Sequence, residues 1–169
     1  MKPLAQTAPV RLLGQASELG DQPQVRAIAA MLVLTGLLSG NGRLARAGVR
    51  VLVAHETATV AKNFIKGRVD RTRPRSATTT HGRTPKEGRS SNKEETSFPS
   101  GHSAGATAAA VAFAGEYPEH RLLALSGAAA IAAAQVPRCA HYPTDVGAGL
   151  AIGALAGAAS NWAFGKLTR

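Results

Sequence analysis

The stretch Phe98-Pro99-Ser100-Gly101-His102 marks the point where a long polar segment ends and an alanine-rich apolar segment begins. Ser100 is placed to cap the first turn of a helix there, because its oxygen can accept a hydrogen bond from a free backbone N–H. Unpaired N–H groups at a helix start bind anions, and a glycine lets the backbone approach an anionic oxygen closely. His102 can serve such an anion as a general acid. An ordinary helix start with a surface histidine would give the same pattern.

A cluster of basic residues lies upstream, in the spacing Lys66-x6-Arg73-Pro74. A phosphate ester carries charge on its non-bridging oxygens, which fixed cations stabilise electrostatically. The planar guanidinium of Arg73 can bind two of these oxygens at once, and Pro74 restricts Arg73 to non-helical geometry. Other arginines crowd the same stretch, so a solvated basic segment is the alternative interpretation.

A third cluster runs from Gln135 to Asp145 and contains Arg138 and His141. If Pro143 lies in the first turn of a helix, Asp145 lies just inside that helix and can reach back towards His141. A carboxylate that holds one imidazole nitrogen leaves the other nitrogen free to attack phosphorus. The alternative is an ordinary histidine–aspartate pair on a helix surface.

Taken in this order, the three clusters resemble the signature of the type 2 phosphatidic acid phosphatase (PAP2) family, which shares its fold with the vanadium haloperoxidases. That signature is Lys-x6-Arg-Pro, then Pro-Ser-Gly-His, then Ser-Arg-x5-His-x3-Asp, and the resemblance covers residues 66–145. It implies hydrolysis of a phosphate ester through a phosphohistidine, with no metal and no cofactor. By position it implies His141 as the nucleophile, Asp145 as its orienting partner and His102 as the general acid. The phosphate would be held by Lys66, Arg73, Ser100 and Gly101.

The third cluster departs from the signature, because the family places an arginine six residues before the nucleophilic histidine and this chain has Gln135 there. Arg138 lies three residues before His141 instead, and positions three apart share a face of a helix. We expect Arg138 to replace the missing arginine at the phosphate and Gln135 to donate a neutral hydrogen bond. Pro137 can distort the helix that this arrangement requires.

The apolar residues predict helices rather than strands. Alternating runs of β-branched and aromatic residues are scarce, and five apolar stretches have helical length. These stretches cover residues 27–39, 44–65, 103–115, 122–136 and 146–164. The predicted fold class is therefore all-α, with about five membrane-embedded helices. The resemblance implies that this helical bundle is of the acid phosphatase–haloperoxidase type. The last stretch would span roughly 29 Å, close to a bilayer core. A compact soluble helical protein is the alternative, since the mean hydropathy of −0.04 is low.

The length of 169 residues suits a single domain over 1–169. Within it we distinguish a polar N-terminal segment, 1–25, without the apolar core of a cleavable signal, and a basic loop, 67–97, between the first two clusters. The formal net charge is +10, and residues 66–93 contain nine lysines and arginines, counting Lys66 and Lys93. This balance fits an anionic substrate, an anionic membrane surface or nucleic acid.

If all five stretches cross a membrane, the basic loop and the third cluster lie on one side, and Arg43, Arg46 and Lys166 lie on the other. The positive-inside tendency then predicts an integral protein of a bacterial inner membrane, with its site facing the periplasm or the cell exterior. The basic loop breaks this tendency, and the need of a phosphate site for cations is the explanation we give for the exception. Its partner would be a phosphorylated lipid substrate in that membrane, and no specific nucleic acid is expected.

Three functions follow from these patterns. The first is hydrolysis of a lipid phosphomonoester or lipid pyrophosphate. The second keeps the fold but holds vanadate for haloperoxidase chemistry, which is typical of far larger soluble proteins. The third is a catalytically inactive basic membrane protein that binds anionic lipid or nucleic acid through the 67–97 loop, with binding that falls steeply as salt rises.

Overall fold

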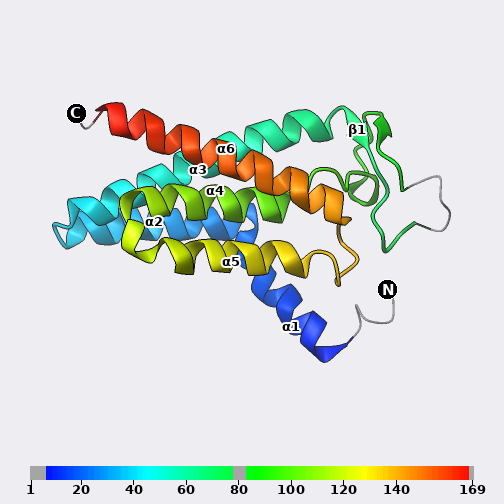
Figure 1. Cartoon of the computed structure of the whole chain (residues 1–169), viewed down its shortest axis with the longest axis horizontal. Coiled ribbons are helices and arrows are strands. Elements are labelled where there is room, and N and C mark those ends of the chain that lie inside the picture. The colour runs from blue at the N-terminus through cyan, green and yellow to red at the C-terminus, as the bar shows by residue number, and fades with distance from the viewer. Residues whose placement is uncertain (1–6, 78–82, 168–169) are drawn as a thin grey trace.

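A computed structural model describes residues 7–77 and 83–167, and this part of the chain is mostly helical (Figure 1). The elements in chain order are α1 (Ala8–Ser17), the 3₁₀ turn η2 (Glu18–Gly20), α2 (Gln22–Leu38), α3 (Gly42–Lys66), β1 (Val69–Asp70), β2 (Lys86–Glu87), the 3₁₀ turn η4 (Lys93–Glu95), α4 (Gly101–Glu116), the 3₁₀ turn η5 (Pro118–His120), α5 (Arg121–Ala134) and α6 (Pro143–Leu167). The predicted all-α class is confirmed.

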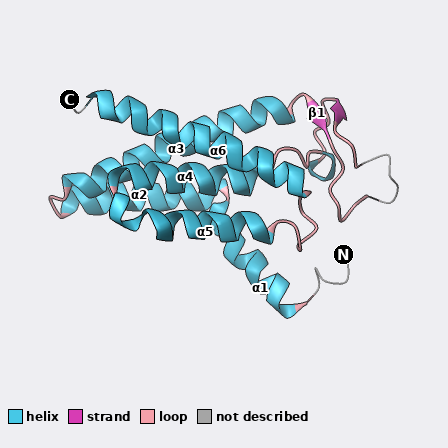
Figure 2. Ribbon diagram, viewed as in Figure 1, coloured by secondary structure: helices cyan, strands magenta, loops and turns pink. Residues whose placement is uncertain are grey.

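The helices α2 to α6 correspond to the five predicted apolar stretches, each with somewhat different ends. Two features differ from the prediction. The polar N-terminal segment contains a helix, α1, over Ala8–Ser17, and the basic loop contains the short antiparallel pair β1–β2, in which Val69 lies opposite Glu87 (Figure 2). Residues 1–6 of that segment and 78–82 of that loop lie outside the described residues.

The helix α4 occupies the centre of the bundle, packed against α3, α5 and α6, while α2 packs against α3 (Figure 1). Glycines on α6 allow the close approach to α4. A Cβ added to Gly149 would lie 2.5 Å from the carbonyl oxygen of Ser100, and one added to Gly153 would lie 2.4 Å from that of Ala104. The first turns of α4 and α6, which carry the second and third motifs, are therefore held backbone to backbone.

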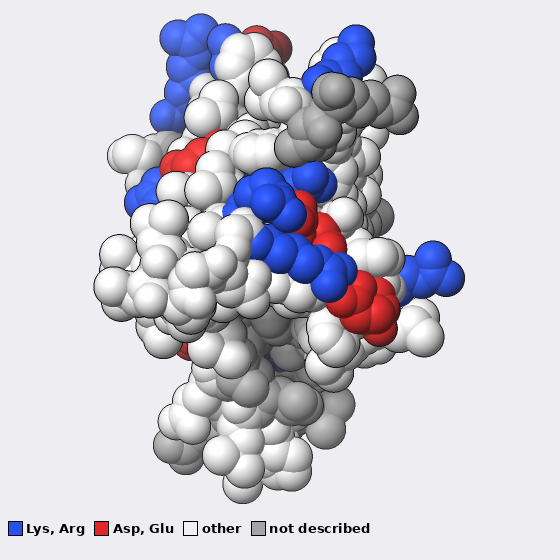
Figure 3. Space-filling view, turned by 90° about the vertical axis from the view of Figure 1, so that its left-hand side faces the viewer, with Lys and Arg blue, Asp and Glu red and all other residues white. Residues whose placement is uncertain are grey.

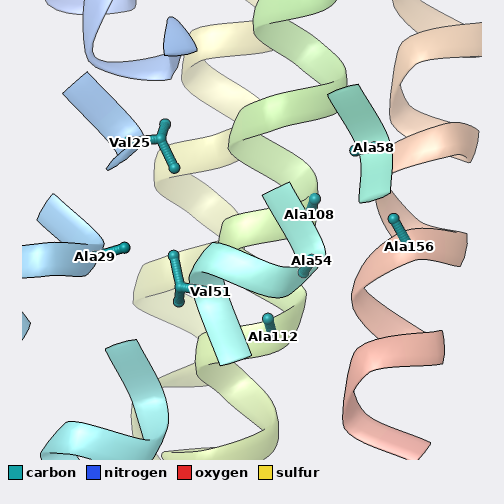
Figure 4. Close-up of a cluster of buried hydrophobic side chains, with 8 residues drawn as sticks. All are labelled: Val25, Ala29, Val51, Ala54, Ala58, Ala108, Ala112 and Ala156. Atoms are coloured by element: carbon teal, nitrogen blue, oxygen red, sulfur yellow. The ribbon is translucent and has the colours of Figure 1, made fainter. Parts of the chain in front are cut away.

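The core between these helices is built from small side chains (Figure 4). Its buried members are Val25, Ala29, Val51, Ala54, Ala58, Ala108, Ala112 and Ala156. They come from α2, α3, α4 and α6, so the four helices share one apolar interior. The end of α3, the start of α4 and the start of α6 meet at the same end of the bundle, beside the basic loop (Figure 1).

Candidate active site

The predicted site residues gather around a cavity at the end of the bundle where α3 ends and α4 begins. The cavity has a volume of about 290 Å³, and its wall comes from η2, the end of α3, the basic loop, the start of α4 and the α5–α6 connection. The predicted residues in its wall are Lys66, Arg73, Gly101, His102, Gln135, Arg138 and His141. The other two predicted residues, Ser100 and Asp145, are fully buried and do not line it.

His141 lies in the connection before α6, with its two ring nitrogens in different surroundings. Nδ1 is 3.6 Å from Oδ2 of Asp145 and 3.5 Å from Oγ of Ser97, while Nε2 is 3.4 Å from Nη1 of Arg73. Burial lowers the pKa of His141 to about 4, and the nearby cations Arg73 and Lys66 act in the same direction against Asp145. The imidazole is therefore neutral at neutral pH, and a proton on Nδ1 leaves the Nε2 lone pair on the Arg73 side.

Asp145 is held by its own helix start and by two residues of the basic loop. In the first turn of α6, its Oδ2 accepts the backbone N–H of Tyr142 at 2.9 Å and the hydroxyl of Ser97 at 2.5 Å. Its Oδ1 accepts a hydrogen bond from Nη1 of Arg71 at 2.5 Å. The structure thus places the carboxylate beside His141, as the predicted helix start required.

Arg71 is a site residue that the sequence reasoning missed. Besides contacting Asp145, its guanidinium donates to the hydroxyl of Thr144 at 2.7 Å and to the carbonyl of Arg83 at 2.6 Å. Arg71 and Arg73 lie two apart in extended chain, so their side chains point to the same side. The spacing of two residues between Arg71 and Arg73 could have predicted that both side chains reach the site. Arg71 contacts the carboxylate of Asp145, and Arg73 contacts His141.

Buried cations give the cavity a positive field. Lys66 is the last residue of α3, and its ammonium donates to a backbone carbonyl of the basic loop. Burial lowers the pKa of Lys66 to about 7, with Arg73 and Lys62 acting in the same direction. Arg73 is anchored by bonds to two backbone carbonyls, at 2.9 and 3.2 Å. Lys62, one turn before Lys66, is buried in the same wall, and the sequence reasoning did not select it.

Ser100 caps α4, as predicted. Its hydroxyl accepts the backbone N–H of Ser103 at 3.4 Å and lies 2.8 Å from the Ser103 hydroxyl, so it is engaged within the helix start. The residues that line the cavity there are Gly101 and His102, whose N–H groups belong to the unpaired first turn. The N–H of Ser100 donates to the carbonyl of Asp145 at 3.0 Å, which ties the second motif to the third.

Two carboxylates that were not predicted lie beside His102. Oε2 of Glu18 is 3.7 Å from Nε2 of His102. With Asp21 they form a group whose ligand atoms lie within 4.8 Å of one another. Burial lowers the pKa of His102, and Asp21 and Glu18 oppose that effect. Two carboxylates and an imidazole at this spacing could bind a metal cation, or the carboxylates could stabilise the protonated form of the histidine.

The helical geometry expected for Arg138 is wrong. α5 ends at Ala134 and the chain then turns, so Arg138 and His141 do not share a helix face. The guanidinium of Arg138 donates instead to the hydroxyl of Ser17 at 2.5 Å and to Oε1 of Glu18 at 2.8 Å. Arg138 still lines the cavity, but in this structure its charge is directed to the N-terminal turn.

Gln135 supports the loop that carries His141. It is fully buried, and its backbone carbonyl accepts the N–H groups of Ala140 and His141, both at 3.2 Å. Its side-chain Nε2 donates to the carbonyl of Ile131 at 3.0 Å. Its Oε1 has no hydrogen-bond partner among the residues that the structure describes.

Comparison with known proteins identifies a family for the chain. A family model described as the PAP2 superfamily matches residues 47–169, a range that contains all three motifs. Neither a curated protein nor a solved structure gives a significant match to the chain.

Proposed function

The chain belongs to the PAP2 superfamily, which generally comprises phosphatases, and we propose that it removes phosphate from a phosphorylated lipid. The substrate would be a phosphomonoester or the terminal phosphate of a pyrophosphate. The observation that carries the proposal is the setting of His141. One of its nitrogens faces Asp145, the other is 3.4 Å from Arg73, and His102 lies in the wall of the same cavity.

In the proposed first step, Nε2 of His141 attacks phosphorus and the bond from phosphorus to the leaving oxygen breaks. His102 donates a proton to that oxygen, so the leaving group departs as a neutral alcohol or as a phosphate that has gained the proton. Asp145 stabilises the positive charge that develops on His141. Lys66, Arg73 and the amides at the start of α4 stabilise the oxygens of the transferring group.

In the second step, water attacks the phosphohistidine and the phosphorus–nitrogen bond breaks. His102, now unprotonated, accepts the proton of the attacking water. Inorganic phosphate leaves, and both histidines return to their starting protonation states. Side-chain cations and helix amides supply the positive field in both steps, so we propose that neither step requires a metal or a cofactor.

The outer surface of the bundle supports a lipid substrate and a membrane location. Large apolar side chains are exposed on the sides of the helices, a surface that soluble monomers rarely present over such an extent. They include Met31, Leu34 and Leu38 on α2, Val53 and Val60 on α3, Leu122 and Leu123 on α5, and Leu155 and Trp162 on α6. By length and hydropathy α6 is long and apolar enough to cross a membrane, and α2 is a shorter apolar helix. We propose that about five helices are embedded together, with the cavity at the membrane surface.

The end of the bundle opposite the cavity carries a network of charges. Arg46 and Arg50 contact Glu116 at 2.9 and 3.0 Å, and Arg43 contacts Glu119 at 2.7 Å. Figure 3 shows this end, where basic and acidic side chains adjoin near the middle of the face and uncharged atoms flank them. Basic residues here fit the positive-inside tendency. The basic loop at the cavity end breaks that tendency, and we attribute its charge to the cations that a phosphate site requires. We therefore propose a bacterial inner-membrane protein whose cavity faces the periplasm or the exterior.

The test is phosphate release by the full chain, purified in detergent, from a panel of lipid phosphates and lipid pyrophosphates with EDTA present. His141→Ala is the test variant. His120→Ala is the matched control, because His120 lies in η5 at the end of α4 remote from the cavity. We expect release by the wild-type chain and by His120→Ala, and none by His141→Ala.

Release that persists in His141→Ala would refute the proposed nucleophile. A folded wild-type protein that releases phosphate from no member of the panel would argue for the inactive, basic membrane protein. In that case binding to anionic vesicles should fall with salt and should be unaffected by His141→Ala.

A further inference from the structure

The turn η2 packs directly against the first turn of α4, although it lies outside the range that the family model matches. Gly20 permits this contact. A Cβ added to Gly20 would lie 3.2 Å from the carbonyl of His102, 3.4 Å from Cβ of Ala106 and 2.8 Å from Cγ2 of Ile131. The carboxylates on either side of this glycine, Glu18 and Asp21, are thereby brought to the His102 side of the cavity.

Glu18 lies between two functional side chains. Its Oε1 accepts a hydrogen bond from Nη2 of Arg138 at 2.8 Å, and its Oε2 is 3.7 Å from Nε2 of His102. The hydroxyl of Ser17 accepts a hydrogen bond from the other terminal nitrogen of Arg138, Nη1, at 2.5 Å. A Cβ added to Gly14 would lie 3.1 Å from Nε of the same arginine. The N-terminal segment therefore binds Arg138 and faces His102 with one carboxylate.

The charged groups around His102 come from three parts of the chain. Glu18 and Asp21 face it from η2 and the residue after that turn, Arg138 faces it from the α5–α6 connection, and Lys62 lines the same cavity from α3. Lys66, Arg73, Arg75 and Lys93 line the cavity as well, so its two carboxylates lie among six basic side chains. Without the carboxylates, burial and the neighbouring cations would together disfavour a protonated imidazole.

We propose that Glu18 and Asp21 are positioning residues for His102, which hold its imidazole against η2 and increase the fraction of it that carries the proton for the leaving oxygen. The inference rests on the proposed function, in which His102 is the general acid. Glu18 has a second effect, because it neutralises Arg138, whose charge would otherwise repel the imidazolium. Burial lowers the pKa of His102 and outweighs Asp21 and then Glu18, which raise it, so the two carboxylates limit this fall without reversing it.

A pH titration of the His102 ring by NMR tests this without any need for turnover. The full chain, labelled on its histidines and purified in detergent, contains five histidines, and the His102 signal is assigned by its loss in His102→Ala. We expect Glu18→Gln and Asp21→Asn each to shift the His102 titration to lower pH, and Glu18→Asp to restore much of the wild-type midpoint. Glu119→Gln, which removes the same charge from η5, should leave it unchanged.

Activity gives a second readout with a defined sign. A general acid must be protonated, so activity is lost as pH rises through its pKa. Removing either carboxylate should move the alkaline limb of kcat/KM to lower pH, with the loss restored on acidification. His102→Ala, by contrast, should lose roughly 10²–10⁴-fold at every pH.

The outcomes separate this inference from the proposed function. If no lipid phosphate is hydrolysed but the His102 titration still shifts, the proposed function fails while the electrostatic coupling stands. An unshifted titration in both Glu18→Gln and Asp21→Asn overturns the inference. Asp21→Asn is decisive if Glu18→Gln fails to fold, because no hydrogen bond to Arg138 depends on Asp21. Zinc binding that is abolished by Glu18→Gln, together with EDTA-sensitive activity, would also overturn it by making the cluster a metal site.

Discussion

Arg71→Ala would leave the Asp145 carboxylate buried without its guanidinium partner. Asp145 has no exposed surface, and the side chain of Arg71 is 10% exposed, so the pair is largely shielded from water. Removing one partner of a buried ion pair typically costs about 3–5 kcal/mol. Ser97 and the N–H of Tyr142 still bond to the carboxylate, so we expect the lower end of that range. A loss of about 3 kcal/mol corresponds to a fall in Tm of roughly 6–12 °C for a chain of this size.

The same substitution should change the pH dependence of activity. Without Arg71, the Asp145 carboxylate attracts a proton on His141 more strongly, so the pKa of His141 rises from its value of about 4. The nucleophile must be neutral, and activity is lost as pH falls through that pKa. The acid limb of kcat/KM should therefore move to higher pH.

Thermal unfolding in detergent and a pH–rate profile measure these two effects. Arg75→Ala is the control for stability, because Arg75 lies in the same loop but pairs with Glu94 where both side chains are well exposed. Such a pair contributes about 0–1 kcal/mol. Equal changes in Tm for the two variants, or an acid limb that does not move in Arg71→Ala, would refute the reasoning.

Three further predictions concern other site residues and the packing of α6 on α4. Lys66→Arg replaces an ammonium whose pKa is about 7 with a group that stays protonated. His102 still sets where activity begins to fall as pH rises, so the alkaline limb of kcat/KM should keep its position and become less steep above a pH of about 7. An unchanged slope would refute a role for the Lys66 charge. Gly153→Leu adds a side chain at a position where even a Cβ would lie 2.4 Å from the carbonyl oxygen of Ala104. Thermal unfolding should show that the free energy of unfolding falls by about 1–3 kcal/mol or more. Arg138→Ala should raise KM because Arg138 lines the cavity, and Gln135→Ala should lower Tm because Gln135 is fully buried. If Gln135→Ala alone abolished turnover, the role of the missing arginine would belong to the glutamine.

The parts of the site that depend on one turn of chain were predictable from the sequence. The Ser100 cap and the approach of Asp145 to His141 both follow from where a helix begins. The five long apolar stretches likewise predicted helices α2 to α6. In each case the residues that interact are within four positions of one another, so spacing alone carries the information.

The residues that were missed depend on contacts between distant segments. Arg71 and Ser97 reach Asp145 across 74 and 48 positions, and Glu18 contacts Arg138 across 120. The sequence does not indicate which residues so far apart will meet in the fold. The basic residues around Arg71 are also typical of a solvated loop. The error for Arg138 has a local cause, because the prediction extended a helix beyond its end at Ala134.

The alanine-rich interior has a consequence for which mutations this protein can accept. Most of its core residues, such as Ala54, Ala108 and Ala112, already have the smallest side chain that still favours a helix. A truncation that opens a cavity is therefore not available at these positions, and nearly every substitution must enlarge the residue. A saturation library should accordingly show intolerance of size in the interior and broad tolerance among apolar residues at exposed positions such as Leu122, the reverse of a protein whose core is built from leucine and phenylalanine.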